Sequence, residues 1–169
     1  NKTIKLLNIG IFKKIKNQKF LIEVANILQK KYKLNFILLI IGKGPLEKFL
    51  KNKVEDLNLK NNVKIINNDD KILSALNHCD IYLSSSISES FGLTILDALF
   101  FNKKVLVSNI DISKEFILKQ HSEFICDLEP DFFAKRIVNL SSKKIENLDM
   151  LYKNKFDFNT SISKYKKIF

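Results

Sequence analysis

The sequence predicts an α/β fold built on a doubly wound parallel sheet of about six strands. Three observations carry this prediction. Short apolar runs alternate with longer segments of helical periodicity along almost the whole chain. One run, Asn35–Ile41, is almost continuously apolar, which is typical of a parallel strand buried on both faces. The 169 residues suit one domain, and no repeat or Gly/Ser-rich linker divides them. This strand–helix alternation places helices on both faces of the sheet.

The first half of the chain contains three strand–helix units. The first apolar run stops at Gly10, and a helical stripe follows, with Asn17 at the N-cap position. The second run is closed by a Gly-Lys-Gly-Pro turn. The third helix has Asp69 or Asp70 as its expected cap. In order, the expected elements are strand Lys5–Ile9, helix Asn17–Lys31, strand Asn35–Ile41, helix Leu46–Leu57, strand Val63–Ile66 and a helix that runs to about His78.

The second half continues the alternation with shorter elements. A last helix is expected from Asn159 or Thr160, with Ile162, Tyr165 and Phe169 at helical spacing. It either forms the outer wall of this core or packs on something absent from this chain. The elements before it are strand Ile81–Leu83, helix Phe91–Phe101, strand Lys104–Val107, a short helix near Ser113–Leu118, strand Glu123–Cys126 and helix Pro130–Leu140.

The amino-acid composition restricts which binding partners and which cellular environment we expect for this chain. The formal charge is +11, but Arg136 is the single arginine among 29 basic residues. Base readout favours arginine, so a solvated lysine coat is preferred over a nucleic-acid footprint. Two cysteines, Cys79 and Cys126, are too few for a disulfide scaffold and indicate a reducing compartment. No apolar run reaches the roughly 20 residues of a membrane span. The chain begins with Asn1, and we expect it to be a piece of a larger protein.

Ligands of an open parallel sheet bind beyond the carboxyl ends of its strands. The richest segment at such a place is 84–97, which passes from a strand through a polar turn into a helix near Gly92. A helix start offers unpaired N–H groups to a phosphate. Glu89 precedes the helix and Asp97 lies about one and a half turns inside it. These carboxylates are expected to hold different hydroxyl groups of one extended ligand with a phosphate between them.

Structural alternatives stay open at this point. Glu89 can simply cap the helix, since carboxylates are common at helix starts, and Asp97 can be an ordinary surface residue. Lys16, after the first strand, is the candidate for a diphosphate, against the more common solvated lysine. The turn with Gly42 and Gly44 is weak alone, and it is neither a Walker A loop nor a dinucleotide-binding glycine pattern.

Metal and nucleophile chemistry finds no support in the sequence. There is no Asp-x-Asp motif and no His/Cys cluster with metal spacing. His78 and His121 are expected to be structural or surface groups, and nothing indicates a serine or cysteine triad. Lysine and backbone N–H groups, with no metal and no other cofactor, are therefore expected to stabilise a bound diphosphate.

The motif segments named at the end of this paragraph form a specific pattern when their order and spacing are taken together. They resemble the C-terminal half of the group 1 GT-B glycosyltransferases, mostly retaining enzymes that use nucleotide sugars. The resemblance runs from about Leu6 to Phe169. It implies that the sheet is Rossmann-like and is one half of a GT-B fold. Its segments are Gly10, Lys16-Asn17-Gln18, Ile41-Gly-Lys-Gly-Pro45, Asn62–Ile66, Cys79-Asp-Ile-Tyr-Leu83, Ser86, Glu89-Ser-Phe-Gly-Leu93 and Asp97-Ala98.

The resemblance assigns roles to individual residues. Glu89 takes the catalytic position beside the donor sugar, and Asp97 binds the ribose. Lys16 faces the diphosphate of a UDP- or GDP-linked donor. The mechanism, front-face or double displacement, stays open, and Glu89 is not assigned as a nucleophile. The remaining donor-binding residues implied are Gly10, Gly42, Gly44, Ser90, Phe91, Gly92 and Leu93.

Several positions depart from the family pattern. Asp97 replaces the usual Glu, and Ile11 stands at the family's arginine position. The loop Ser108–Ile112 lacks the usual glycines, and Asn102 and Ser85 replace a Gly and a Pro. These changes favour the alternative function, a non-catalytic or degenerate Rossmann-like binding module. A titration with UDP, GDP and ADP separates the two.

The expected organisation follows from the resemblance. Residues 1–158 form the nucleotide-sugar-binding domain, and the helix at 159–169 packs on a missing N-terminal domain that binds the acceptor. The full-length protein is expected to be a hexosyltransferase-like enzyme of bacterial polysaccharide biosynthesis, with a glycan or lipid-linked acceptor. It is expected to be cytoplasmic and to touch the anionic inner face of the membrane peripherally. The fragment alone is expected to bind nucleotide without turnover.

Overall fold

The computed structural model describes residues 2–67, 69–145 and 147–156, and it contains the expected parallel sheet. Six strands lie in the order β3-β2-β1-β4-β5-β6, and every neighbouring pair is parallel. The order reverses between β1 and β4, which opens a crevice at the carboxyl ends of these two strands. The strands are β1 (Ile4–Ile9), β2 (Phe36–Ile41), β3 (Val63–Ile66), β4 (Ile81–Ser84), β5 (Lys104–Ser108) and β6 (Ile125–Cys126).

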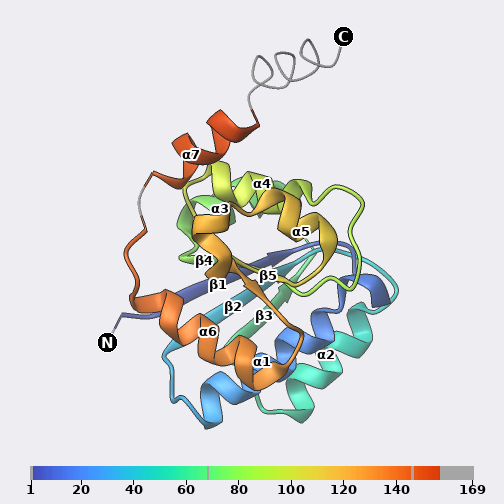
Figure 1. Ribbon diagram of the computed structural model, residues 1–169. Coiled ribbons are helices and arrows are strands. Elements are labelled where there is room, and N and C mark those ends of the chain that lie inside the picture. The colour runs from blue at the N-terminus through green and yellow to red at the C-terminus, as the bar shows by residue number, and fades with distance from the viewer. Residues whose placement is uncertain (1, 68, 146, 157–169) are drawn as a thin grey trace.

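Helices cover both faces of the sheet, as the alternation predicted. Figure 1 shows α1, α2 and α6 on one face and α3, α4 and α5 on the other, with α7 beside α4. Three short 3-10 helices, η1 (Lys14–Lys16), η2 (Asp69–Lys71) and η3 (Lys119–Phe124), complete the connections. The α-helices are α1 (Gln18–Lys30), α2 (Glu47–Asp56), α3 (Ile72–His78), α4 (Leu93–Phe100), α5 (Asp111–Phe116), α6 (Pro130–Ser142) and α7 (Leu148–Lys155).

The core lies between the sheet and these helices. On one face, α1 and α6 meet through Phe20 and Phe133, whose rings are 5.2 Å apart in an edge-to-face arrangement. The strand β2 differs from the expectation of burial on both faces. Its residues 36, 38 and 40 are buried, whereas Ile37 on the opposite face is 42% exposed. Ala75 and His78, on α3, line a pocket together with Ile37 and Leu39, so this face of the strand is only partly covered.

Several predicted helix starts are corrected. Helix α4 begins at Leu93, because Gly92 adopts a left-handed conformation (φ 67°) as its N-cap. Lys71 is the N-cap of α3, so the prediction of Asp69 or Asp70 there is wrong, and residues 69–71 form η2 instead. Asn17 is the N-cap of α1, but it is left-handed and its side chain makes no cap hydrogen bond.

The C-terminal third was predicted least well. The expected strand over 123–126 contains only Ile125 and Cys126, because η3 occupies the residues before them. Helix α7 was not expected at all. The helix predicted at 159–169 lies outside the described residues. Both cysteines are free and buried. Within 2–67, 69–145 and 147–156, no helix has the length and apolar character needed to cross a bilayer.

Candidate functional site

The candidate site lies where β1 and β4 run side by side. These strands pair through Leu6 with Ile81 and Leu7 with Tyr82, and both carry their chains to the same edge of the sheet. The loop after β1 leads to α1 on one face, and the loop after β4 leads to α4 on the other. The crevice therefore has one loop on each side.

The two loops are tied to each other by hydrogen bonds. The hydroxyl of Ser85 donates to the carbonyl of Asn17 at 2.9 Å, and it also lies 3.2 Å from that of Lys16. The N–H of Ile87 donates to the carbonyl of Ile15 at 2.8 Å. Ser85, which stands where the family has a proline, thus has a structural use. These bonds fix the spacing between the segments that carry Lys16 and Glu89.

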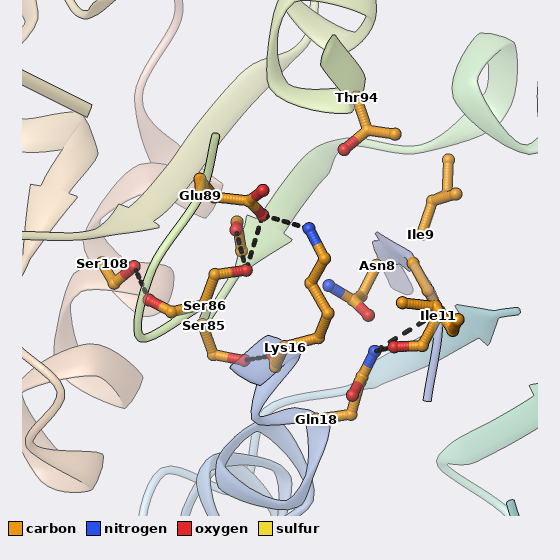
Figure 2. A network of polar contacts seen from close by, with 12 residues as sticks. Asn8, Ile9, Ile11, Lys16, Gln18, Ser85, Ser86, Glu89, Thr94 and Ser108 are labelled. Carbon is orange, nitrogen blue, oxygen red and sulfur yellow. Dashed lines mark hydrogen bonds and ion pairs between the residues drawn. The ribbon is translucent and has the colours of Figure 1, made fainter. Parts of the chain in front are cut away.

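Lys16 and Glu89 form an ion pair across the crevice. The Lys16 Nζ atom lies 2.5 Å from Glu89 Oε1, and the side chains are 25% and 10% exposed. The hydroxyl of Ser86 donates to the same oxygen at 2.7 Å (Figure 2). Glu89 therefore does not cap α4, whose N-cap is Gly92, and Lys16 is not a freely solvated lysine. The helix-cap alternative for Glu89 and the solvated alternative for Lys16 are therefore wrong, whereas their roles in donor binding stay predictions.

The end of β5 holds the loop that carries Ser86 and Glu89 in place. The hydroxyl of Ser108 donates to the carbonyl of Ser86 at 2.6 Å. Ser108 is 1% exposed and Ser86 is 2% exposed, so this bond is shielded from water. Figure 2 shows Ser108 and Ser86 beneath Glu89. The strand β5 thereby fixes the backbone that presents the Ser86 hydroxyl to the carboxylate.

Tyr82 is a buried polar group of the site that the sequence reasoning missed. Its hydroxyl lies 2.8 Å from the Thr94 Oγ1 atom and 3.3 Å from the Ile9 carbonyl. Burial raises the pKa of Tyr82, and the nearby Glu89 and Asp97 carboxylates raise it further. The phenol thus stays neutral and joins the end of β1 to the first turn of α4. In the sequence, the signal that could have indicated this role was a tyrosine inside the apolar run Ile81–Leu83.

Asp97 lies on α4 one turn after Leu93, and both are exposed. Partial burial raises the pKa of Asp97 above its usual value. The surface alternative for this residue is consistent with its exposure, and its role in ribose binding stays a prediction. The neighbouring Ser90, Phe91 and Leu93 are exposed as well, so this loop is open to a ligand.

The glycines near the site are explained by packing. A Cβ atom on Gly42 would lie 2.0 Å from the Gly10 carbonyl oxygen. One on Gly44 would lie 2.8 Å from backbone atoms of Phe12. The loop after β2 therefore fits against the loop after β1 only without side chains. Gly10 has more room, with its nearest neighbour atom 3.7 Å from the built Cβ.

Asn8 ties β1 to β4, and Gln18 braces the loop after β1. The amide of Asn8 donates to the Leu83 carbonyl at 2.8 Å, and that of Gln18 donates to the Ile11 carbonyl at 3.1 Å. Both side chains are almost fully buried. Ile11 itself is 43% exposed, so the residue at the family's arginine position offers an apolar side chain to the surface.

Comparison with known proteins identifies the family. The sequence model described as Glycosyl transferases group 1 matches residues 1–157. The chain belongs to the group 1 glycosyltransferases. One relative in this family is the capsular polysaccharide biosynthesis glycosyltransferase CapH of Staphylococcus aureus, 29% identical over 95% of this chain and 46% of CapH. The chain therefore spans about half the length of this relative.

Solved structures share the fold of this chain. The C-terminal domain of LpcC from Francisella tularensis has a TM-score of 0.77 at 22% identity, covering 92% of this chain and 87% of that one. HepE from Anabaena, solved with UDP and glucose, has a TM-score of 0.76 at 18% identity, covering 98% of this chain and 48% of HepE. The Rossmann-like sheet described above is thus that of one GT-B half.

The geometry defines what the site can do. A lysine, a carboxylate and the start of α4 meet at the crevice, and the first-turn N–H groups of a helix have no acceptors within the helix. Across the described part of the chain, no group of three or more His, Cys, Asp or Glu side chains is placed to hold a metal ion. The arrangement suits a ligand with a diphosphate between two hydroxylated groups. Lys13 and Lys14, at the start of η1, are exposed.

Proposed function

We propose that this chain is the donor-binding domain of a retaining glycosyltransferase that moves a sugar from a nucleotide diphosphate sugar to a glycan or lipid-linked acceptor. The observation that carries the proposal is the Lys16–Glu89 pair at the sheet's switch point, beside the start of α4. A cation and a carboxylate in contact can separate to hold a diphosphate and a sugar hydroxyl. The family membership supports the reaction class.

Each side chain then has a defined task. Lys16 moves from Glu89 to the diphosphate, and Glu89, still accepting from Ser86, turns to the sugar hydroxyls. Asp97 binds the ribose, and the N–H groups around Phe91–Leu93 face the phosphate. Positive charge that develops on the donor sugar is stabilised by Glu89, and the departing phosphate by Lys16 and these N–H groups. In this proposal, Lys16 and the N–H groups offset the negative charge of the diphosphate, and a metal ion does not.

A nucleotide titration tests the proposal. A ligand that binds the folded chain at a hundred times its Kd stabilises it by about 2.7 kcal/mol. We expect a clear rise in melting temperature with one of UDP, GDP and ADP, and a smaller rise in Asp97→Ala. Asp56→Ala, an exposed aspartate at the end of α2, is the matched control and should respond like the wild type. Absence of a response to all three nucleotides would support the non-catalytic binding module instead.

We also propose that the chain touches an anionic membrane through the groove beside η1. Lys14, Lys19, Leu46 and Phe49 line this groove, and Phe49 is 48% exposed. Lysines around an exposed aromatic ring suit a negatively charged lipid surface. We expect cosedimentation with phosphatidylglycerol-rich vesicles, but not with phosphatidylcholine vesicles.

A charge-matched pair of variants tests this contact. The double variant Lys14→Glu/Lys19→Glu should abolish binding to the anionic vesicles. Lys30→Glu/Lys135→Glu makes the same change of charge at exposed positions outside the groove and should retain most of the binding. Equal loss in both variants would mean that only net charge matters, and the assigned groove would be wrong.

A further inference from the structure

Three phenylalanine rings form a column that leads from the candidate site to α7. Phe91, in the loop after β4, meets Phe116 edge-on with ring centroids 5.7 Å apart. Phe116, the last residue of α5, meets Phe156 in the same manner at 5.5 Å. Phe156 is the residue that follows α7. We call these three residues the aromatic column.

The middle ring also touches the backbone of the site. A Cβ atom on Gly92 would lie only 3.0 Å from Phe116 Cε2, so the ring already packs closely against this glycine. Gly92 is the left-handed N-cap of α4. Phe116 therefore contacts two consecutive residues of the segment expected to present its N–H groups to the donor.

Helix α7 is in turn fixed to the elements that carry Phe116. The ammonium of Lys155 donates to the Phe116 carbonyl at 2.8 Å and also to that of Glu115. The hydroxyl of Tyr152 accepts from the N–H of Leu118 at 3.1 Å. Tyr152 is fully buried, so this anchor is not a surface contact. The position of Phe156 is thus set by α7 and not by the loop after β4 that carries Phe91.

We propose that Phe116 and Phe156 are positioning residues that hold the 89–93 loop in its donor-binding conformation, although neither need touch the donor. The proposal rests on the proposed function of that loop. Phe91 is 57% exposed, and Phe116 is its aromatic contact among the described residues. When a binding-competent conformation is only partly populated, the apparent affinity falls by that fraction. Loss of the Phe156 ring would loosen Phe116 and so depopulate that conformation.

The test compares three substitutions at Phe156 in the full chain. Phe156→Leu keeps apolar volume but removes the ring, Phe156→Tyr keeps the ring, and Phe156→Ala removes both. An edge-to-face pair contributes about 0.5–1.5 kcal/mol, so we expect nucleotide affinity to weaken roughly 3- to 10-fold in the Leu and Ala variants. The Tyr variant should bind like the wild type. Phe132→Ala, at an exposed phenylalanine on α6, is the control.

Hydrogen exchange provides a readout that does not depend on nucleotide. In the Leu variant, amides of the peptide spanning 87–96 should exchange faster, while β1 and β2 amides keep their protection. Unchanged exchange of this peptide, or faster exchange with unchanged nucleotide affinity, would overturn the proposal. Failure of the wild type to bind any nucleotide would instead count against the proposed function, since the exchange result stands apart from it. If the Ala variant unfolds, the Leu variant decides.

Discussion

Lys16 and Glu89 neutralise each other across the crevice, so under the proposed function both change partner when a diphosphate binds. Their contact joins positions 73 residues apart. The sequence indicated each residue separately, because each follows a strand end. It did not indicate their pairing, since side-chain contact depends on how the two loops are tied through Ser85 and Ile87. Tyr82 was missed for the same reason, because its partners are set by strand order.

In the proposed function, Glu89 and a bound diphosphate compete for Lys16, and this competition leads to a prediction at Glu89. In Glu89→Gln the anion that holds Lys16 is lost, so a nucleoside diphosphate no longer has to displace it. We expect the affinity for the nucleoside diphosphate without sugar to rise about threefold, which corresponds to roughly 0.65 kcal/mol. Isothermal titration calorimetry measures the change.

Two comparisons give the Glu89→Gln result its meaning. In Lys16→Met the cation itself is lost, and the affinity should fall. Glu47→Gln removes another lysine-paired glutamate, 2.7 Å from Lys51 on α2, and should leave the affinity unchanged. Equal weakening in Glu89→Gln and Lys16→Met would contradict the competition.

At the scale of elements, predictability follows the strength of the apolar pattern. Strands β3 and β5 agree with the sequence to within one residue, because the short β-branched and apolar runs Val-Lys-Ile-Ile and Val-Leu-Val mark them. Helix α7 was missed because only Leu148 and Tyr152 of its eight residues are buried, which gives too little periodicity. Its stability comes from specific contacts with α4 and η3. Those contacts involve His121, whose Nδ1 atom lies 3.2 Å from the Tyr152 hydroxyl.

The packing of α7 on η3 should depend on pH. Burial lowers the pKa of His121 below its usual value of 6.5; Lys143 lowers it too, while Glu123 opposes the shift. Below pH 6.5 the unfolded chain therefore binds more protons than the folded chain, and stability falls as the pH falls. One such group contributes a slope of at most about 1.4 kcal/mol per pH unit.

Urea unfolding at pH 7.5 and pH 5.5 checks this expectation. The loss of unfolding free energy on acidification should be smaller in His121→Phe, which keeps a ring between Phe124 and Tyr152 but cannot titrate. His78→Gln, at an exposed histidine, should keep the wild-type loss. The same acid-induced loss in His121→Phe as in the wild type would rule out His121 as the cause.

At the scale of the whole molecule, the chain spans about half the length of its relative CapH. The strand order places the proposed donor crevice at the carboxyl edge of a single sheet, and CapH is about twice as long as the matched segment. The family motifs made the fold and the crevice predictable. The acceptor was not predictable, because the residues expected to choose it belong to the other half.

This division predicts binding without turnover. Incubated with UDP- or GDP-linked sugars and candidate glycan acceptors, the 169-residue chain should bind the nucleotide yet release no product above background. Addition of the remaining half of the protein should restore transfer with retention at the anomeric carbon, measured by NMR of the product. Sustained transfer by the chain alone would show that the site is complete in one domain.

The sheet has a further property at its two margins. β6 pairs only through two residues, Ile125 and Cys126, and β3 has four residues with Lys64 exposed among them. Short edge strands that carry a charged side chain offer few unpaired backbone N–H and C=O groups with which a strand of another chain could pair. We therefore expect concentrated solutions of this domain to resist strand-to-strand aggregation.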